Sequence, residues 1–82
     1  SAVPTVRLSR SARGVLLEAS DAHQDLLLAG LRSLTRFPEI GRRIHGRRRR
    51  LLILPFAVIY DLSPDRDEVT VISIRPAWER RE

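Results

Sequence analysis

Three short apolar segments separated by turn signals fill the second half of the chain, and they constrain the fold most strongly. They are "RRRLLIL" (48–54), "FAVIYDL" (56–62) and "EVTVISI" (68–74). Pro55 cannot donate a ladder hydrogen bond, and Pro64 holds the second position of the turn signal "SPDRD". Strands joined by such short turns pair as antiparallel neighbours. The sequence therefore predicts a three-stranded meander.

The first half of the chain predicts a further strand and a helical region. Residues 3–9, "VPTVRLS", alternate apolar and polar side chains, which is typical of a strand. From Ala12 to Ala29 the apolar residues recur at helical spacing, and Ser9 or Ser11 is placed to cap the helix. The pattern ends before Pro38, because proline restricts the residue that precedes it.

A polar interruption, "ASDAHQD" (19–25), leaves the number of helices open. Asp21 followed by Gln24 has the form of a capping box, which would start a second helix. The apolar periodicity also continues through the interruption, so one long helix fits as well. We favour a bent pair of helices.

Length and composition point to one small α+β domain over residues 1–82, in the order β-α(α)-β-β-β. We expect a small antiparallel sheet of about four strands, with one or two helices packed on one face. Residues 76–82 are expected to form a loose polar tail with Trp78 as its anchor. Cysteine is absent, and two isolated histidines do not indicate a metal site, so no metal or cofactor is expected. No apolar run approaches the ~20 residues of a membrane span, and a cytoplasmic location is expected.

The chain is strongly basic, with a net charge of +5, and all its basic residues are arginines. Guanidinium groups stay charged and bind phosphates or carboxylates, which favours RNA, DNA or an acidic protein as partner. The run Arg47–Arg50 cannot lie on one face of a strand, so its first half is expected in a loop. A solvated rim that keeps the domain soluble is the alternative. The candidate target-binding residues are Arg42, Arg43, Arg47, Arg48, Arg49, Arg50 and Arg75.

Both faces of the predicted sheet are apolar at its centre. Simple alternation turns Ile59 to the face of the sheet opposite to that of Tyr60. In the same way it turns Ile72 and Ile74 to the face opposite to that of Val71. One helical layer covers only one face, so either the sheet curls over its own residues or a partner chain covers the second face. We favour a partner. Its candidate contacts are Ile59, Ile72, Ile74 and Trp78. The sequence does not determine which of the two faces is the free one.

Three segments together resemble the RelE/ParE superfamily of toxins from bacterial type II toxin–antitoxin pairs, over about residues 3–75. They are "LSRSA", "LRSLTRFPEIGR" and "RRLLILPFAVIYDLSPDRDEVTVISI". The resemblance implies a compact basic toxin that is neutralised, in a hetero-oligomer, by an antitoxin that wraps it. RelE-like members cleave mRNA in the ribosome, whereas ParE-like members inhibit DNA gyrase. A non-toxic basic nucleic-acid-binding or interaction module is the alternative.

RNA cleavage by attack of the 2′-hydroxyl needs a base, an acid and a group that stabilises the negative charge of the phosphorane. His45 is the histidine nearest the arginines and the candidate base, with Arg50 and Arg75 as candidate charge-stabilising groups. Tyr60 ends an apolar face, which is typical of a core tyrosine. Ribonuclease members often carry arginine where this chain has Ala57. Whether the protein is a ribosome-dependent endoribonuclease is therefore left open.

Overall fold

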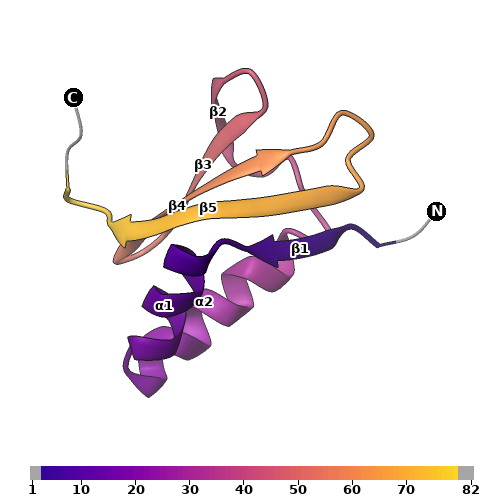
Figure 1. Ribbon diagram of the computed structural model, residues 1–82. Helices are drawn as coiled ribbons and strands as arrows, with labels where there is room; N and C mark the ends of the chain where they lie inside the picture. Colours follow the sequence, from indigo (N-terminus) through magenta and orange to yellow (C-terminus); the bar gives the residue numbers. More distant parts are fainter. Residues whose placement is uncertain (1–2, 80–82) are drawn as a thin grey trace.

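The computed structural model describes residues 3–79, which form two helices and a five-stranded sheet (Figure 1). The α+β class and the predicted order of elements are confirmed, with one strand more than expected. The elements are β1 (Thr5–Leu8), α1 (Arg10–Glu18), α2 (Asp21–Ser33), β2 (Arg42–His45), β3 (Arg48–Ile53), β4 (Phe56–Leu62) and β5 (Glu68–Pro76).

The strands lie in the order β1-β5-β4-β3-β2, and the sheet is mixed rather than purely antiparallel. The predicted meander β3-β4-β5 is antiparallel, and β2 extends it beyond β3. At the other edge β1 pairs parallel to β5, with Thr5 beside Glu68 and Leu8 beside Val71. The expectation of an antiparallel sheet is wrong at this edge, because the helical region lies between β1 and the meander and returns the chain so that β1 and β5 run in the same direction.

Serine caps start both helices. The Ser9 hydroxyl accepts the amide of Ala12 at 3.1 Å and donates to the Ile72 carbonyl at 2.6 Å, so the cap also ties α1 to β5. The Ser20 side chain accepts the amide of His23 at 3.2 Å and starts α2. The favoured bent pair of helices is confirmed.

The cap of α2 differs from the one expected, because Ser20 rather than Asp21 holds the N-cap position. The Gln24 side chain does not return to the cap backbone. It donates instead to the Leu16 carbonyl in α1 at 2.9 Å. Gln24 therefore joins the two helices at their bend, a contact that a local capping pattern does not reveal.

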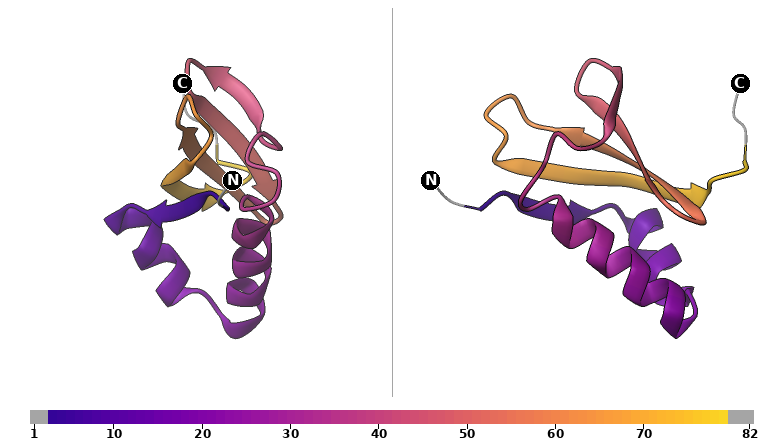
Figure 2. Two further views of the ribbon diagram at one scale, coloured as in Figure 1. Left: turned by 90° about the vertical axis from the view of Figure 1, so that its right-hand side faces the viewer. Right: turned by 180° about the vertical axis from the view of Figure 1, so that it is seen from behind.

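Both helices pack on the same side of the strongly twisted sheet (Figure 2). Their buried leucines meet a row of apolar side chains from β4 and β5, and this contact forms the core. The main core residues are Leu16, Leu27, Leu31, Leu34, Val58, Tyr60, Leu62, Val69, Val71 and Ile74.

A β-bulge changes the face on which Ile74 lies. Tyr60 pairs with Val71, but the preceding Ile59 pairs with Ser73, so Ile72 is the extra residue in β5. Alternation restarts after the bulge, and Ile74 pairs with a core residue and is 4% exposed. The predicted placement of Ile74 on the second face is therefore wrong, because it assumed uninterrupted alternation.

The predicted tail begins later than expected, since β5 continues through Pro76. Trp78 is 75% exposed and does not anchor the segment to the core. Residues 80–82 of the predicted tail lie outside the described residues.

Tyr60 is a core tyrosine, as predicted, and its hydroxyl organises the loop between α2 and β2. The hydroxyl donates to the Pro38 carbonyl at 2.7 Å and accepts the Gly41 amide at 2.9 Å. Arg49 donates to the carbonyls of Glu39 and Gly41 at 3.0 and 2.9 Å. Burial raises the pKa of Tyr60, because the ionised phenolate would lose its hydration. We call these contacts the Tyr60 network.

Substitution of Gly41 should disrupt the Tyr60 network. A Cβ at Gly41 would lie 2.7 Å from both Cε1 and the hydroxyl oxygen of Tyr60. We expect Gly41→Ala to lower the free energy of unfolding by ~1–3 kcal/mol, because a packed core absorbs an added methyl group poorly. Urea denaturation measures the change.

Gly14→Ala is the matched control, since nothing lies within 4 Å of a Cβ built there in α1. Alanine is the better helix former, so this variant should be as stable as the wild type or more so. Equal stability of the two alanine variants would show that Gly41 does not limit the packing of Tyr60.

Tyr60→Phe should destabilise the protein by ~1–3 kcal/mol, because it leaves the buried Gly41 amide without its acceptor. The raised pKa of Tyr60 also predicts a pH effect. Its contribution is fully present below the pKa of an unfolded tyrosine, about 10, and is lost as the pH rises through the folded-state pKa. Wild-type stability should therefore fall more steeply above pH ~10 than that of Tyr60→Phe. An equal loss of stability with rising pH in the wild type and in Tyr60→Phe would contradict this expectation.

Candidate functional site

The face of the sheet turned away from α1 and α2 is here called the open face (Figures 1 and 2). Residues that pair directly across neighbouring strands share one face, so the sheet register defines its members. They are Arg7, Arg42, His45, Arg48, Arg50, Leu52, Ala57, Ile59, Asp61, Thr70, Ser73 and Arg75.

Two rows of paired residues cross the centre of the open face. In the first row His45 of β2 lies beside Arg48, which lies beside Asp61 of β4. In the second row Arg42 lies beside Arg50, and Ile59 follows in β4. Directly paired side chains have Cβ atoms ~4.5–5.5 Å apart. The fold therefore brings an imidazole, a carboxylate and three guanidinium groups into one area.

Acidic side chains neutralise some of these arginines. Arg48 donates to both carboxylate oxygens of Asp61, at 2.9 and 3.3 Å, and this contact raises the pKa of Arg48. Arg7 pairs with Glu68 at 3.1 Å. Arg75, at the end of β5, pairs with Glu79 at 3.4 Å.

Arg42 and Arg50 have no ion pair within residues 3–79. They are nevertheless exposed neighbours in one row of the sheet. Like charges directly opposite each other repel, and a bound anion would relieve that repulsion. This pair is therefore the part of the open face best suited to a phosphate.

The seven arginines predicted to bind a target do not act as one group. Arg42, Arg48, Arg50 and Arg75 lie on the open face. The period of two in β3 turns Arg49 to the opposite face, and Arg43 pairs with it there. Arg47 lies in the turn between β2 and β3, as expected for the first half of the run. Four of the seven therefore share the open face.

The two histidines occupy different environments. His45 is exposed on the open face, beside Arg48. His23 packs edge-on against Phe56 of β4, with ring centroids 5.2 Å apart, so it belongs to the helix–sheet contact. Within residues 3–79 no three histidine or acidic side chains gather to hold a metal ion. Over the same residues no helix has the length and apolar character needed to cross a membrane.

Apolar side chains occupy the middle of the open face, but they are partly covered. Ala57 is 7% exposed and Ile59 is half-buried, whereas Leu52 is exposed. Ile72 is half-buried at the bulge. Part of the apolar surface for which a partner was expected is therefore already covered by the chain itself.

Sequence reasoning missed Asp61, the carboxylate that holds Arg48. Alternation along residues 56–62 does place Asp61 with Ala57 and Ile59, so the signal for its face was present. Its neighbour was not predictable in the same way, because the pairing of Arg48 with Asp61 depends on the register set by the turn at Pro55.

The sequence matches no model of a known protein family and no curated protein. The structure is similar to RelE in the archaeal RelE–RelB complex from Pyrococcus horikoshii OT3, with a TM-score of 0.77 and 17% identity over 96% of this chain and 100% of that one. A chain of the toxin–antitoxin complex RelBE2 from Mycobacterium tuberculosis gives a TM-score of 0.79 and 15% identity, over 92% and 99% of the two chains. The isolated E. coli RelE toxin gives a TM-score of 0.77 and 18% identity, over 96% of this chain and 88% of that one. This chain therefore has the RelE toxin fold.

Proposed function

We propose that this protein is the toxin of a type II toxin–antitoxin pair, and that its open face binds RNA of the translation machinery. The observation that carries the proposal is the exposed Arg42–Arg50 pair, which has no carboxylate partner among residues 3–79. The similar structures support it, because they are RelE toxins, several of them solved together with RelB antitoxins. The RelE toxins among the similar structures favour RNA over DNA gyrase as the target.

The open face offers the chemistry that an RNA backbone requires. Arginine side chains fork onto phosphate oxygens, and Arg42 and Arg50 are free to do so without first breaking an ion pair. Arg48 and Arg75 lie beyond them in neighbouring rows and could engage further phosphates by exchanging their carboxylate partners. The apolar Ile59 and Leu52 lie between these charges and offer a surface for bases.

An antitoxin would serve as the neutralising partner. In this proposal it covers the apolar part of the open face, with Ile59 as a contact and Trp78 and Ile72 at the margin. Ile74, which the sequence predicted as an antitoxin contact, lies in the core and is not part of this surface. An acidic antitoxin would also compensate the unpaired charge of Arg42 and Arg50.

Cleavage of RNA would depend on His45. Tyr60 is buried, and its hydroxyl is bonded to Pro38 and Gly41, so it does not reach the open face. His45 is exposed beside Arg48. In this assignment His45 takes the proton of the 2′-hydroxyl as its oxygen attacks phosphorus, and Arg48 and Arg50 stabilise the charge on the phosphorane. The bond between phosphorus and the 5′-oxygen then breaks, and the leaving 5′-oxygen takes a proton from solvent water.

Binding without cleavage is the second candidate function. Ala57, rather than a charged residue, lies at the centre of the open face, and the described open face carries one imidazole. A protein with this face could occupy a ribosomal site and block it. The two candidates differ only in the chemical step, so one experiment separates them.

We expect wild-type protein to cleave mRNA on purified ribosomes, and His45→Gln to cleave about 10²-fold or more slowly. Primer extension on the mRNA measures the cleavage, and filter binding measures retention on the ribosome. His45→Gln should bind as tightly as the wild type. Tight ribosome binding by wild-type protein without any cut would instead support the second candidate.

Induction of the protein alone should arrest growth of a bacterial host, and co-expression of its antitoxin should restore growth. We expect this antitoxin to be encoded beside the gene for this protein. Colony counts after induction measure both effects. Normal growth with abundant soluble protein would contradict the toxin assignment.

The double variant Arg42→Gln/Arg50→Gln should bind single-stranded RNA more weakly, with its melting temperature nearly unchanged. Surface charges contribute little to stability, whereas each lost phosphate contact lowers the slope of log K against log salt by ~0.7. Two lost contacts therefore predict a slope that is shallower by ~1.4. Fluorescence anisotropy at several salt concentrations measures this slope.

Arg10→Gln/Arg32→Gln is the matched control, since these two exposed arginines lie on the helices and their loss changes the net charge equally. It should keep most of the RNA affinity. Arg49→Gln should show the converse behaviour. It should lower the melting temperature through the loss of its bonds to Glu39 and Gly41 and leave the RNA salt slope nearly intact. Equal weakening by both double variants would mean that only net charge matters.

A further inference from the structure

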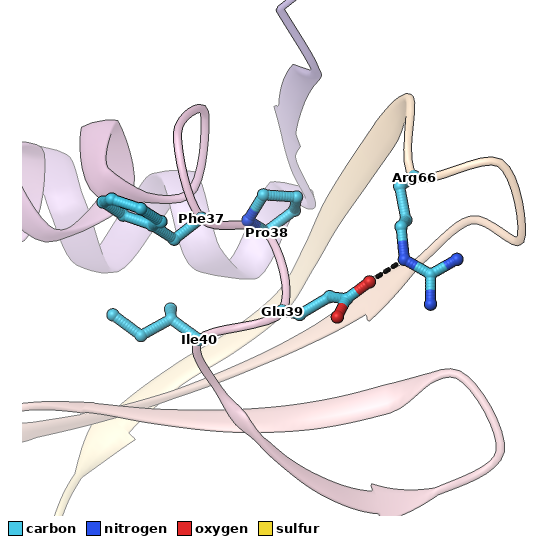
Figure 3. A pocket seen from close by; sticks show the side chains of 5 residues that line it. All are labelled: Phe37, Pro38, Glu39, Ile40 and Arg66. Carbon is cyan, nitrogen blue, oxygen red and sulfur yellow. Dashed lines mark ion pairs between the residues drawn. The ribbon is translucent and has the colours of Figure 1, made fainter.

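A second exposed surface lies beside the loop between α2 and β2. Its first part is an apolar depression of about 690 Å³ formed by Phe37, Pro38 and Ile40, with Glu39 and Arg66 at its edge (Figure 3). Phe37 is 60% exposed and Ile40 is 51% exposed. Two large apolar side chains next to each other on a small domain favour a protein contact.

The second part is a basic depression of about 340 Å³ that shares Arg66 with the first. Arg43, Arg47 and Arg49 also line it, together with Ser63. Among these four arginines, Arg66 is the one with a carboxylate partner within residues 3–79, and that partner is Glu39. The depression therefore carries an excess of positive charge.

Backbone contacts hold three of these guanidinium groups in place. Arg43 donates to the Gly46 carbonyl at 3.1 Å, and Arg66 donates to the Pro64 carbonyl at 3.2 Å. Arg49 is fixed by its two bonds to the loop. Each guanidinium has five N–H donors, and these contacts use only one or two of them. The remaining donors are ordered before any ligand arrives, which lowers the entropic cost of binding.

The ion pair between Glu39 and Arg66 joins the two depressions (Figure 3). It links the α2–β2 loop to the turn between β4 and β5. A continuous surface therefore passes from apolar at Phe37 to basic at Arg43 and Arg47. We call it the Phe37–Arg47 groove.

We propose that the Phe37–Arg47 groove binds an acidic segment of a protein partner, with a large apolar side chain in the first depression and carboxylates in the second. Carboxylates match the ordered guanidinium groups, and the apolar side chain matches Phe37, Pro38 and Ile40. A nucleic acid fits less well. A base in the apolar depression would leave its polar edge unpaired.

This proposal stands apart from the proposed function, because it uses the other side of the β2–β3 hairpin. Arg43 and Arg49 form a pair on the face opposite to Arg42 and Arg50. Peptide in the groove and RNA on the open face should therefore bind simultaneously. The failure of one assignment leaves the other intact.

The test uses a fluorescein-labelled peptide with four consecutive glutamates flanked on each side by leucine, so that chain direction does not matter. We expect it to bind the full-length protein with a Kd below about 1 mM. The variants Arg43→Gln/Arg47→Gln and Phe37→Ser should each weaken binding at least about tenfold, the loss expected for a single charge-assisted contact or one buried apolar side chain. Arg49 is left unchanged because it supports the loop.

Arg42→Gln/Arg50→Gln is the matched control and should bind the peptide as the wild type does. Peptides with glutamine in place of glutamate, or serine in place of leucine, should each bind about tenfold more weakly. Thermal denaturation confirms that every variant is folded. An eight-nucleotide uridine RNA, added at saturation, should not displace the peptide.

Several results would overturn the proposal. A Kd for the peptide above about 1 mM would contradict the proposal. Loss of peptide binding in Arg42→Gln/Arg50→Gln alone would place the peptide on the open face. Displacement of the peptide by the RNA would make the groove a nucleic-acid site. A monomer–dimer equilibrium in sedimentation that Phe37→Ser abolishes would assign the groove to a second copy of this chain.

Discussion

The buried hydroxyl of Tyr60 is the contact on which the geometry of the open face and of the Phe37–Arg47 groove depends. It bonds to Pro38 and Gly41, and only a residue without a side chain allows the loop to approach the ring so closely. The loop carries Phe37 and Ile40 and leads directly into β2. A polar group in the core thus stabilises the fold and also sets the positions of the open face and of the Phe37–Arg47 groove.

The arginines show how one run of like charges is divided between two surfaces. Because side chains alternate along a strand, Arg48 and Arg50 face one side of the sheet while Arg49 faces the other. Asp61 neutralises Arg48, and backbone carbonyls hold Arg49. Arg50 has neither kind of partner in residues 3–79, and Arg42 lies beside it. Repulsion between these two is a local cost of the free state, and it is the physical reason to expect an anion there.

The candidate site was predictable from the sequence in part. Composition and the run at residues 47–50 identified the basic surface, and alternation in residues 56–62 separated Ile59 from the core face. Alternation gave the wrong face for Ile74, because the bulge at Ile72 adds one residue to β5 and so reverses the face of each side chain that follows. Trp78 shows a different failure, since the prediction that an aromatic residue near a chain end anchors the segment does not hold for a side chain that is largely exposed within the described residues.

The sequence by itself determined the local features of this protein: the helical periodicity, the turns at Pro55 and Pro64, the three alternating strands and the positive charge. Each of these depends on residues a few positions apart. Only the tertiary structure decided the features that depend on distant pairing. The contact of β1 with β5 joins residues 5–8 to residues 68–71, and β2 pairs with β3 although "RRIH" has no apolar alternation. The meeting of Phe37 and Arg66 in one groove has the same origin, because two loops far apart in sequence come together only when the backbone hydrogen bonds of the sheet have set their positions.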